Sequence, residues 1–117
     1  MTFCVLLPFP MSVNTLYTNV KGRGRVTTGR YRDWQWEAAL MLKKQTLRKF
    51  DKRVDIEIRC GKGRANQDIS NLIKSVEDTL VKNDILIDDN KKYVRSVKAS
   101  WDDDVAGCVV FIEECEE

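Results

Sequence analysis

The chain has 117 residues, of which 20 are Lys or Arg, 18 are Asp or Glu and none is His, with a net charge of +2. This length suits a single domain over residues 1–117 with a hydrophobic core of its own. Because histidine is absent, Ser-His-Asp and Cys-His catalysis are excluded, and any hydrolytic reaction must use carboxylates, lysine or a metal ion.

The N-terminal part of the chain predicts a short strand followed by a basic loop. Residues 3–9, FCVLLPF, form an apolar run that prolines end, as expected for a buried strand. Residues 18–32 then carry five basic side chains, three glycines and no acid. Arginines on a flexible loop can follow DNA phosphates, so we expect contacts from Lys21, Arg23, Arg25, Arg30 and Arg32. An ordinary solvated hairpin or loop is the alternative.

A helix and a strand follow. The helical pattern begins at Tyr31. Trp34 and Trp36 lie on different faces of this helix; we expect both in the core, and the alternative is that one of them lines an interface or stacks on a base. Residues 50–60 alternate between apolar and charged side chains, as a half-buried strand does. The next loop lacks the ending of a phosphate-binding P-loop, but it would bring two positive charges beside Asp68, on Lys62 and Arg64.

Residues 66–90 predict an amphipathic helix with acidic groups at both ends. Apolar residues recur at helical spacing from Ile69 to Leu80, which predicts a helix over about residues 69–82. Asp68 suits the N-cap of this helix, and Asp88-Asp89-Asn90 follows it as a turn. The opposite face of the helix stacks three polar side chains that can reach one another, Asn71, Lys74 and Asp78. Each of these residues also has an ordinary explanation as a cap, a turn former or a solvated charge.

The C-terminal part predicts two strands. Residues 91–101 read as a strand, the three aspartates at 102–104 as a hairpin turn rather than a metal site, and residues 105–112 as an apolar strand buried on both faces. The order of elements predicts a single α+β domain in which two helices pack on a mixed sheet.

Charge is divided unevenly along the chain. Residues 1–67 hold 14 basic and 5 acidic side chains, whereas residues 68–117 hold 6 and 13. A basic half suits a polyanion and an acidic half suits a divalent cation. The asymmetry therefore favours a metal-dependent nuclease over a purely basic binding protein, with chance clustering of solvated charges as the alternative.

The central segment also resembles a known family. The string Asp68-x-Ser70-Asn71-x-x-Lys74-x-x-x-Asp78-x-Leu80, followed by Asp88-Asp89, closely resembles the signature of RusA-type Holliday junction resolvases. The segments P-x-S-x-N-x-x-Y at residues 10–17 and Y-R-x-W at residues 31–34 fit the same family. The resemblance implies a RusA-like fold and a small phage- or prophage-type endonuclease that works as a homodimer. It would bind a four-way DNA junction and resolve it by paired nicks in recombination or repair.

The resemblance also assigns roles to residues of this chain. It implies that Asp68 and Asp89 hold Mg²⁺, or alternatively Mn²⁺, and that Lys74 steadies the phosphate. Asn71 and Asp78 would hold Lys74 in place, and Asp88 is a further ligand or a turn former. Ser70 stands at a ligand position where the family usually carries a second metal-binding aspartate; Asp88 or Glu57 are candidates to replace the missing carboxylate.

This substitution leaves other functions open. Because a hydroxyl binds Mg²⁺ weakly, a catalytically weakened structure-selective DNA-binding protein of the same fold is the main alternative. An RNA-binding or interaction module is a third alternative, and only the basic charge supports it.

The sequence also bears on the location of the protein and on its cysteines. No apolar run suits a membrane span, and the opening residues lack the basic start of a signal peptide, so we expect a cytoplasmic protein, associated with the nucleoid when bound to DNA, without a membrane partner or a small-molecule cofactor. Four widely spaced cysteines argue against a zinc site and a disulfide scaffold. We expect them to be reduced and mostly packed.

Overall fold

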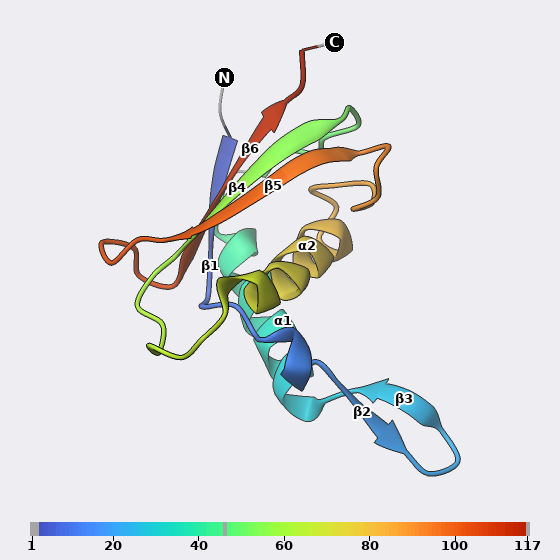
Figure 1. The fold of residues 1–117 in the computed structure, drawn as a ribbon. Coiled ribbons are helices and arrows are strands. Elements are labelled where there is room, and N and C mark those ends of the chain that lie inside the picture. The colour runs from blue at the N-terminus through green and yellow to red at the C-terminus, as the bar shows by residue number, and fades with distance from the viewer. Residues whose placement is uncertain (1–2, 46, 117) are drawn as a thin grey trace.

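The computed structural model describes residues 3–45 and 47–116, in which two helices lie on one side of a mixed sheet and a small hairpin projects away from it (Figure 1). The predicted α+β class is confirmed. In chain order the elements are β1 (Phe3–Leu7), η1 (Val13–Thr15), β2 (Tyr17–Val20), β3 (Gly24–Thr27), α1 (Gly29–Lys43), β4 (Val54–Cys60), η2 (Ile69–Leu72), α2 (Ile73–Lys82), β5 (Val94–Trp101) and β6 (Cys108–Glu114), where η marks a 3-10 helix.

The four-stranded sheet has the order β1-β6-β4-β5. β6 pairs antiparallel with β1 and with β4, whereas β4 and β5 are parallel. A parallel pair needs a crossover between its strands, and here η2 and α2 supply it. This crossover brings the segment with the predicted site across one face of the sheet.

The connection at residues 102–107 differs from the predicted hairpin turn. It joins β5 to β6, which are not neighbours in the sheet, and so it passes the end of β4. There the N–H of Gly61 donates to the carbonyl of Gly107 at 2.8 Å. A Cβ on Gly61 would lie 2.1 Å from the carbonyl oxygen of Val105, so only glycine allows this close approach. The Asp102 carboxylate accepts the N–H of Asp104 at 3.0 Å as part of a local turn.

The core lies between the sheet and the two helices. Alternate residues of β4, from Val54 to Cys60, are buried, and the residues between them lie on the other face. Trp34 of α1 is buried, but Trp36 is 69% exposed, so the prediction that both tryptophans belong to the core is wrong for Trp36. The prediction that the last strand is buried on both faces is also wrong, since burial alternates along β6.

One side chain pairs with part of the outer edge of β1. The amide of Gln45, just after α1, accepts the N–H of Leu6 and donates to the carbonyl of Leu6, both at 2.8 Å. Cys60 and Cys108 face each other across β4 and β6, and all four cysteines are free. Within the described part of the chain, neither helix is long and apolar enough to cross a lipid bilayer.

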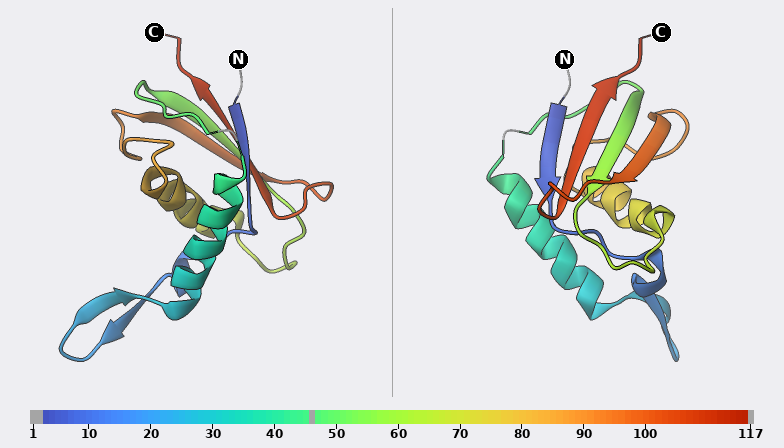
Figure 2. Two further views of the ribbon diagram at one scale, coloured as in Figure 1. Left: turned by 180° about the vertical axis from the view of Figure 1, so that it is seen from behind. Right: turned by 60° about the vertical axis from the view of Figure 1, so that its left-hand side comes forward.

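Residues 18–32, predicted as a flexible basic loop with a hairpin as the alternative, contain a hairpin. β2 and β3 form an antiparallel hairpin, and the last residues of the segment belong to α1. The helix begins where Thr28 accepts the N–H of Tyr31 at 3.2 Å as its N-cap. The hairpin projects beyond the body of the molecule from the N-terminal end of α1 (Figure 2).

Candidate active site

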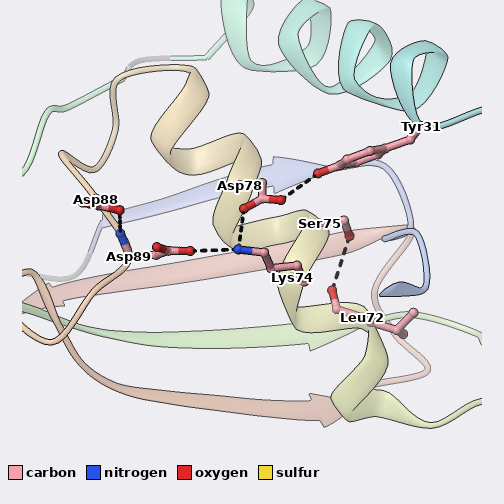
Figure 3. A network of polar contacts seen from close by, with 7 residues as sticks. All are labelled: Tyr31, Leu72, Lys74, Ser75, Asp78, Asp88 and Asp89. Atoms are coloured by element: carbon pink, nitrogen blue, oxygen red, sulfur yellow. Dashed lines mark hydrogen bonds and ion pairs between the residues drawn. The ribbon is translucent and has the colours of Figure 1, made fainter. Parts of the chain in front are cut away.

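Lys74 is the centre of the candidate site. Its ammonium nitrogen lies 3.0 Å from Oδ1 of Asp78, one turn further along α2, and 3.4 Å from Oδ2 of Asp89, in the turn after the helix (Figure 3). The hydrogen bond to Asp78 is the main cause that raises the pKa of Lys74, and Asp89 adds to it. The lysine therefore stays a cation, and its side chain is 46% exposed.

Tyr31 of α1 completes this network from a distant part of the chain. Its hydroxyl donates to Oδ2 of Asp78 at 3.1 Å, and the residue is buried. Burial, with the nearby charge of Asp78, raises the pKa of Tyr31 well above its usual range. The phenol thus remains a hydrogen-bond donor and fixes one oxygen of Asp78 while the other binds Lys74. The sequence prediction named Tyr31 in the Y-R-x-W segment but gave it no role at the site.

Local hydrogen bonds hold the turn that carries Asp89. The carboxylate of Asp88 accepts the N–H of Asp89 at 2.7 Å and the side-chain amide of Asn90 at 3.1 Å. The side chain of Asn90 in turn accepts the N–H of Lys92 at 3.0 Å. Asp88 therefore acts as a turn former in this structure, and it orients Asp89 toward Lys74 (Figure 3).

The start of the central helix differs from the prediction. Residues 69–72 form the 3-10 helix η2, and the α-helix begins only at Ile73. Asp68 stands at the N-cap position, but its side chain makes no capping hydrogen bond. Asp68 and Ser70 are both exposed, and Asn71 is half-buried. Among the described residues, the carboxylates of Asp78 and Asp89 pair with Lys74, whereas Asn71 does not.

Glu77 is a further acid that the sequence prediction missed. Burial raises its pKa, and the charge of Asp89 raises it further. Glu77 follows Lys74 by three positions on α2, so the two side chains lie on one side of the helix. The sequence did contain a sign of this, because Glu77 stands at helical spacing from Lys74. Negative charge is therefore in excess around a single lysine.

A divalent cation at this site would have to bind through oxygen donors. No group of three or more His, Cys, Asp and Glu side chains is placed to hold a metal ion in residues 3–45 and 47–116. Mg²⁺ needs fewer protein ligands, because it keeps several waters and commonly uses one or two carboxylates with a substrate phosphate. Asp68, Asp89 and Ser70 each carry oxygen donors of this kind, and of the three the described contacts join only Asp89 to Lys74.

Glu57 does not replace the carboxylate that Ser70 lacks. It lies on the face of β4 away from the helices and pairs with Arg59 at 2.9 Å. That prediction is wrong because side chains of adjacent strand residues point to opposite faces.

The basic hairpin shares a hollow with Lys74. The lining residues are Tyr17, Arg23, Arg25, Val26, Thr27, Arg32 and Lys74. The guanidinium of Arg25 lies 4.1 Å from the ring centre of Tyr17, which meets Tyr31 edge to face. The contacts of Arg25 with Tyr17 and of Tyr17 with Tyr31 therefore link the hairpin to the Tyr31–Asp78–Lys74 network.

The other predicted DNA contacts are spread over the surface. Lys21 is exposed in the turn between β2 and β3, and Arg30 is exposed on α1. Lys62 lines a different hollow, together with Asp103 and Asp104, and Arg64 is exposed in the loop before η2. The structure thus brings Arg23, Arg25 and Arg32 to Lys74, and it places Lys62 beside the acidic turn after β5.

Comparison with known proteins agrees with this arrangement. A search of curated proteins found no match. The family model described as Endodeoxyribonuclease RusA matches residues 8–113. This range includes the hairpin, both helices and the acids around Lys74. Since the match spans most of its length, the chain belongs to the RusA endodeoxyribonuclease family.

Proposed function

We propose that the protein is a metal-dependent, structure-selective endonuclease that binds four-way DNA junctions and resolves them by paired nicks. The observation that carries this proposal is Lys74, which contacts Asp78 and Asp89 and lines one hollow with the arginines of the hairpin. Positive charge for a DNA backbone and carboxylates for a cation thus meet at one residue.

Each residue has a role that its chemistry supports. An ammonium has three N–H donors, and two of them are directed at carboxylates, which leaves one for a phosphate oxygen. Asp78, held by Tyr31, orients that ammonium. Asp68 and Asp89 would hold Mg²⁺ or Mn²⁺, with Ser70 as a weaker donor and Asp88 as the support of the turn. The ion, when bound, would supply activation of the attacking water and neutralisation of charge at the phosphate.

Paired nicks also call for two active sites. A four-way junction has two-fold symmetry, and a two-fold homodimer would present two equivalent centres to it. We therefore propose that the active form is a homodimer that acts on DNA in the cytoplasm.

Ser70 favours a second candidate, a DNA-binding protein of the same fold with weakened cleavage. A hydroxyl in place of a carboxylate removes one negative charge from the position that should hold a cation. The loss of even a supporting group at a metal site typically costs about 10–100-fold in affinity or activity.

One experiment separates the two candidates. A labelled four-way junction and a matched linear duplex are incubated with the protein in Mg²⁺, Mn²⁺ or EDTA, alongside Ser70→Asp. The nuclease proposal expects nicks in the junction only and only with metal, and Ser70→Asp should raise the rate about 10-fold or more. If the parent binds the junction without cutting and Ser70→Asp restores cutting, the weakened-binder candidate is correct. If neither protein binds the junction, both candidates fail.

A further inference from the structure

A second basic surface lies on the opposite side of the site from the hairpin. A hollow on the surface is lined by Lys52, Arg53, Lys91, Lys92 and Cys115. The three lysines are exposed, and no acidic side chain is among the described residues that line the hollow. They come from two segments, the one before β4 and the one before β5, which the parallel pairing of these strands brings together at one end of the sheet.

The turn that carries Asp89 also carries two of these lysines. Asp88 and Asn90 bind the backbone of the turn, including the N–H groups of Asp89 and Lys92. The backbone of Tyr93 then accepts the N–H of Val54 at 2.9 Å, which ties the turn to the start of β4. The spacing between Asp89 and the lysines is therefore set by a hydrogen-bonded turn attached to the sheet.

The two basic surfaces flank α2. On one side, Lys74 shares a hollow with the hairpin arginines. On the other side it contacts Asp89, and Asp89 precedes Lys91 by two residues in the chain. In both Figure 1 and Figure 2, α2 lies between the turn that leads into β5 and the β2–β3 hairpin. A nucleic acid strand with a phosphate at Lys74 would thus have basic side chains within its path in both directions.

We propose that Lys52, Lys91 and Lys92, with Arg53 behind them, form a second phosphate-binding surface for DNA, on the side of the reactive phosphate opposite to the hairpin. This inference rests on the proposed function, because it takes Lys74 as the place of that phosphate. The lysines contact backbone phosphates and not bases, so the surface adds affinity without sequence preference.

The test compares three sets of variants by equilibrium binding to a four-way junction in EDTA, over a range of salt concentrations. The first is Lys52→Ala/Lys91→Ala/Lys92→Ala. The matched control, Lys43→Ala/Lys44→Ala/Lys98→Ala, removes three exposed lysines from the end of α1 and from β5. The reference, Arg23→Ala/Arg25→Ala, removes charge from the hairpin. Thermal unfolding of each variant checks that it folds.

We expect the first variant to bind at least about tenfold more weakly at low salt, and the plot of log affinity against log salt to lose about 0.9 in slope for each phosphate contact removed. Hydroxyl-radical footprints should lose protection on one side of the position held at Lys74 in the first variant and on the other side in the hairpin variant. The control should match the parent.

The outcomes separate this inference from the proposed function. If the first variant matches the control while the hairpin variant loses binding, the second surface does not exist and the nuclease proposal stands. If the footprints of the two variants change on the same side, the two surfaces do not flank the site, and the inference is wrong. If the parent protein does not bind the junction, both the proposed function and this inference are wrong.

Discussion

The polar networks on the two faces of the protein differ in their charge balance. On the outer face of the sheet the two acids of β4 have basic partners: Glu57 pairs with Arg59 at 2.9 Å, and Asp55 accepts hydrogen bonds from Nε of Arg95 at 3.0 Å and from the hydroxyl of Ser96 at 2.6 Å. On the helix side, one lysine faces several acids, Glu77, Asp78 and Asp89.

This difference separates structural from functional polar groups. A balanced pair on a surface contributes little beyond its local geometry, and it has no remaining charge for a ligand. An excess of carboxylates around one lysine is held in place at a cost in repulsion, and a cation or a substrate phosphate beside Lys74 can offset it. The unbalanced network is therefore the one expected to respond to metal and DNA.

The largest expected effect follows from removing one carboxylate of the unbalanced network. Asp89→Asn should lower the rate of junction nicking at least about 1,000-fold, because a metal ion contributes several kcal/mol of transition-state stabilisation. Junction binding should persist, since a negative charge is removed. Glu57→Gln on the outer face is the matched control and should leave the rate unchanged. Equal losses in the two variants would contradict the distinction between the networks.

A smaller effect is expected at the link between the two helices. Tyr31→Phe removes the hydroxyl that holds Asp78, and we expect the nicking rate to fall about tenfold, as for other groups that position a site residue. The free energy of unfolding should fall by about 1.5 kcal/mol, the scale of a hydrogen bond to a charged group. Steady-state kinetics and urea unfolding measure the two effects, with Tyr93→Phe as the control.

Tyr31 acts on catalysis or on the fold according to which of these two effects is seen. A loss of turnover with unchanged junction affinity would agree with a residue that positions Lys74 through Asp78. If stability falls while the nicking rate stays at the parent value, Tyr31 only supports the fold.

The smallest effect is expected on the balanced face and concerns acid stability. The hydrogen bond from Arg95, followed by that from Ser96, lowers the pKa of Asp55 below its ordinary value of 3.8. The ionised form is thus favoured in the folded state, so its contribution to stability is present above pH 3.8 and is lost as the pH falls through the lowered pKa. Asp55→Asn should flatten the stability curve below about pH 4, as measured by urea unfolding at several pH values. Nicking at neutral pH should not change.

Much of the central network follows from local spacing. Lys74 and Asp78 are four residues apart on a helix whose apolar stripe is evident in the sequence, so their contact could be predicted. Asp89 was expected from the family resemblance, but its distance from Lys74 depends on the turn that reverses the chain after α2. Asp84, with φ of 62°, contributes the left-handed residue that ends the helix there.

Other parts of the site depend on long-range packing. The bond between Tyr31 and Asp78 joins residues 47 positions apart, and no periodicity predicts which core aromatic reaches which acid. The same limit applies to β6, whose apolar sequence did not reveal that one of its faces would be left uncovered by helices. In residues 18–32 the glycines suggested a loop, whereas Gly22 lies in the turn of a hairpin and Gly24 begins β3, both at positive φ.

The side chain of Gln45 changes what the outer edge of β1 offers to another molecule. An apolar edge strand such as β1 presents unpaired N–H and C=O groups, and such an edge can recruit strands from other molecules into a growing fibre. The amide of Gln45 occupies the N–H and the carbonyl of Leu6, as a neighbouring strand would do. A single glutamine therefore removes one of the backbone pairs through which a strand of another molecule could add to this edge of the sheet.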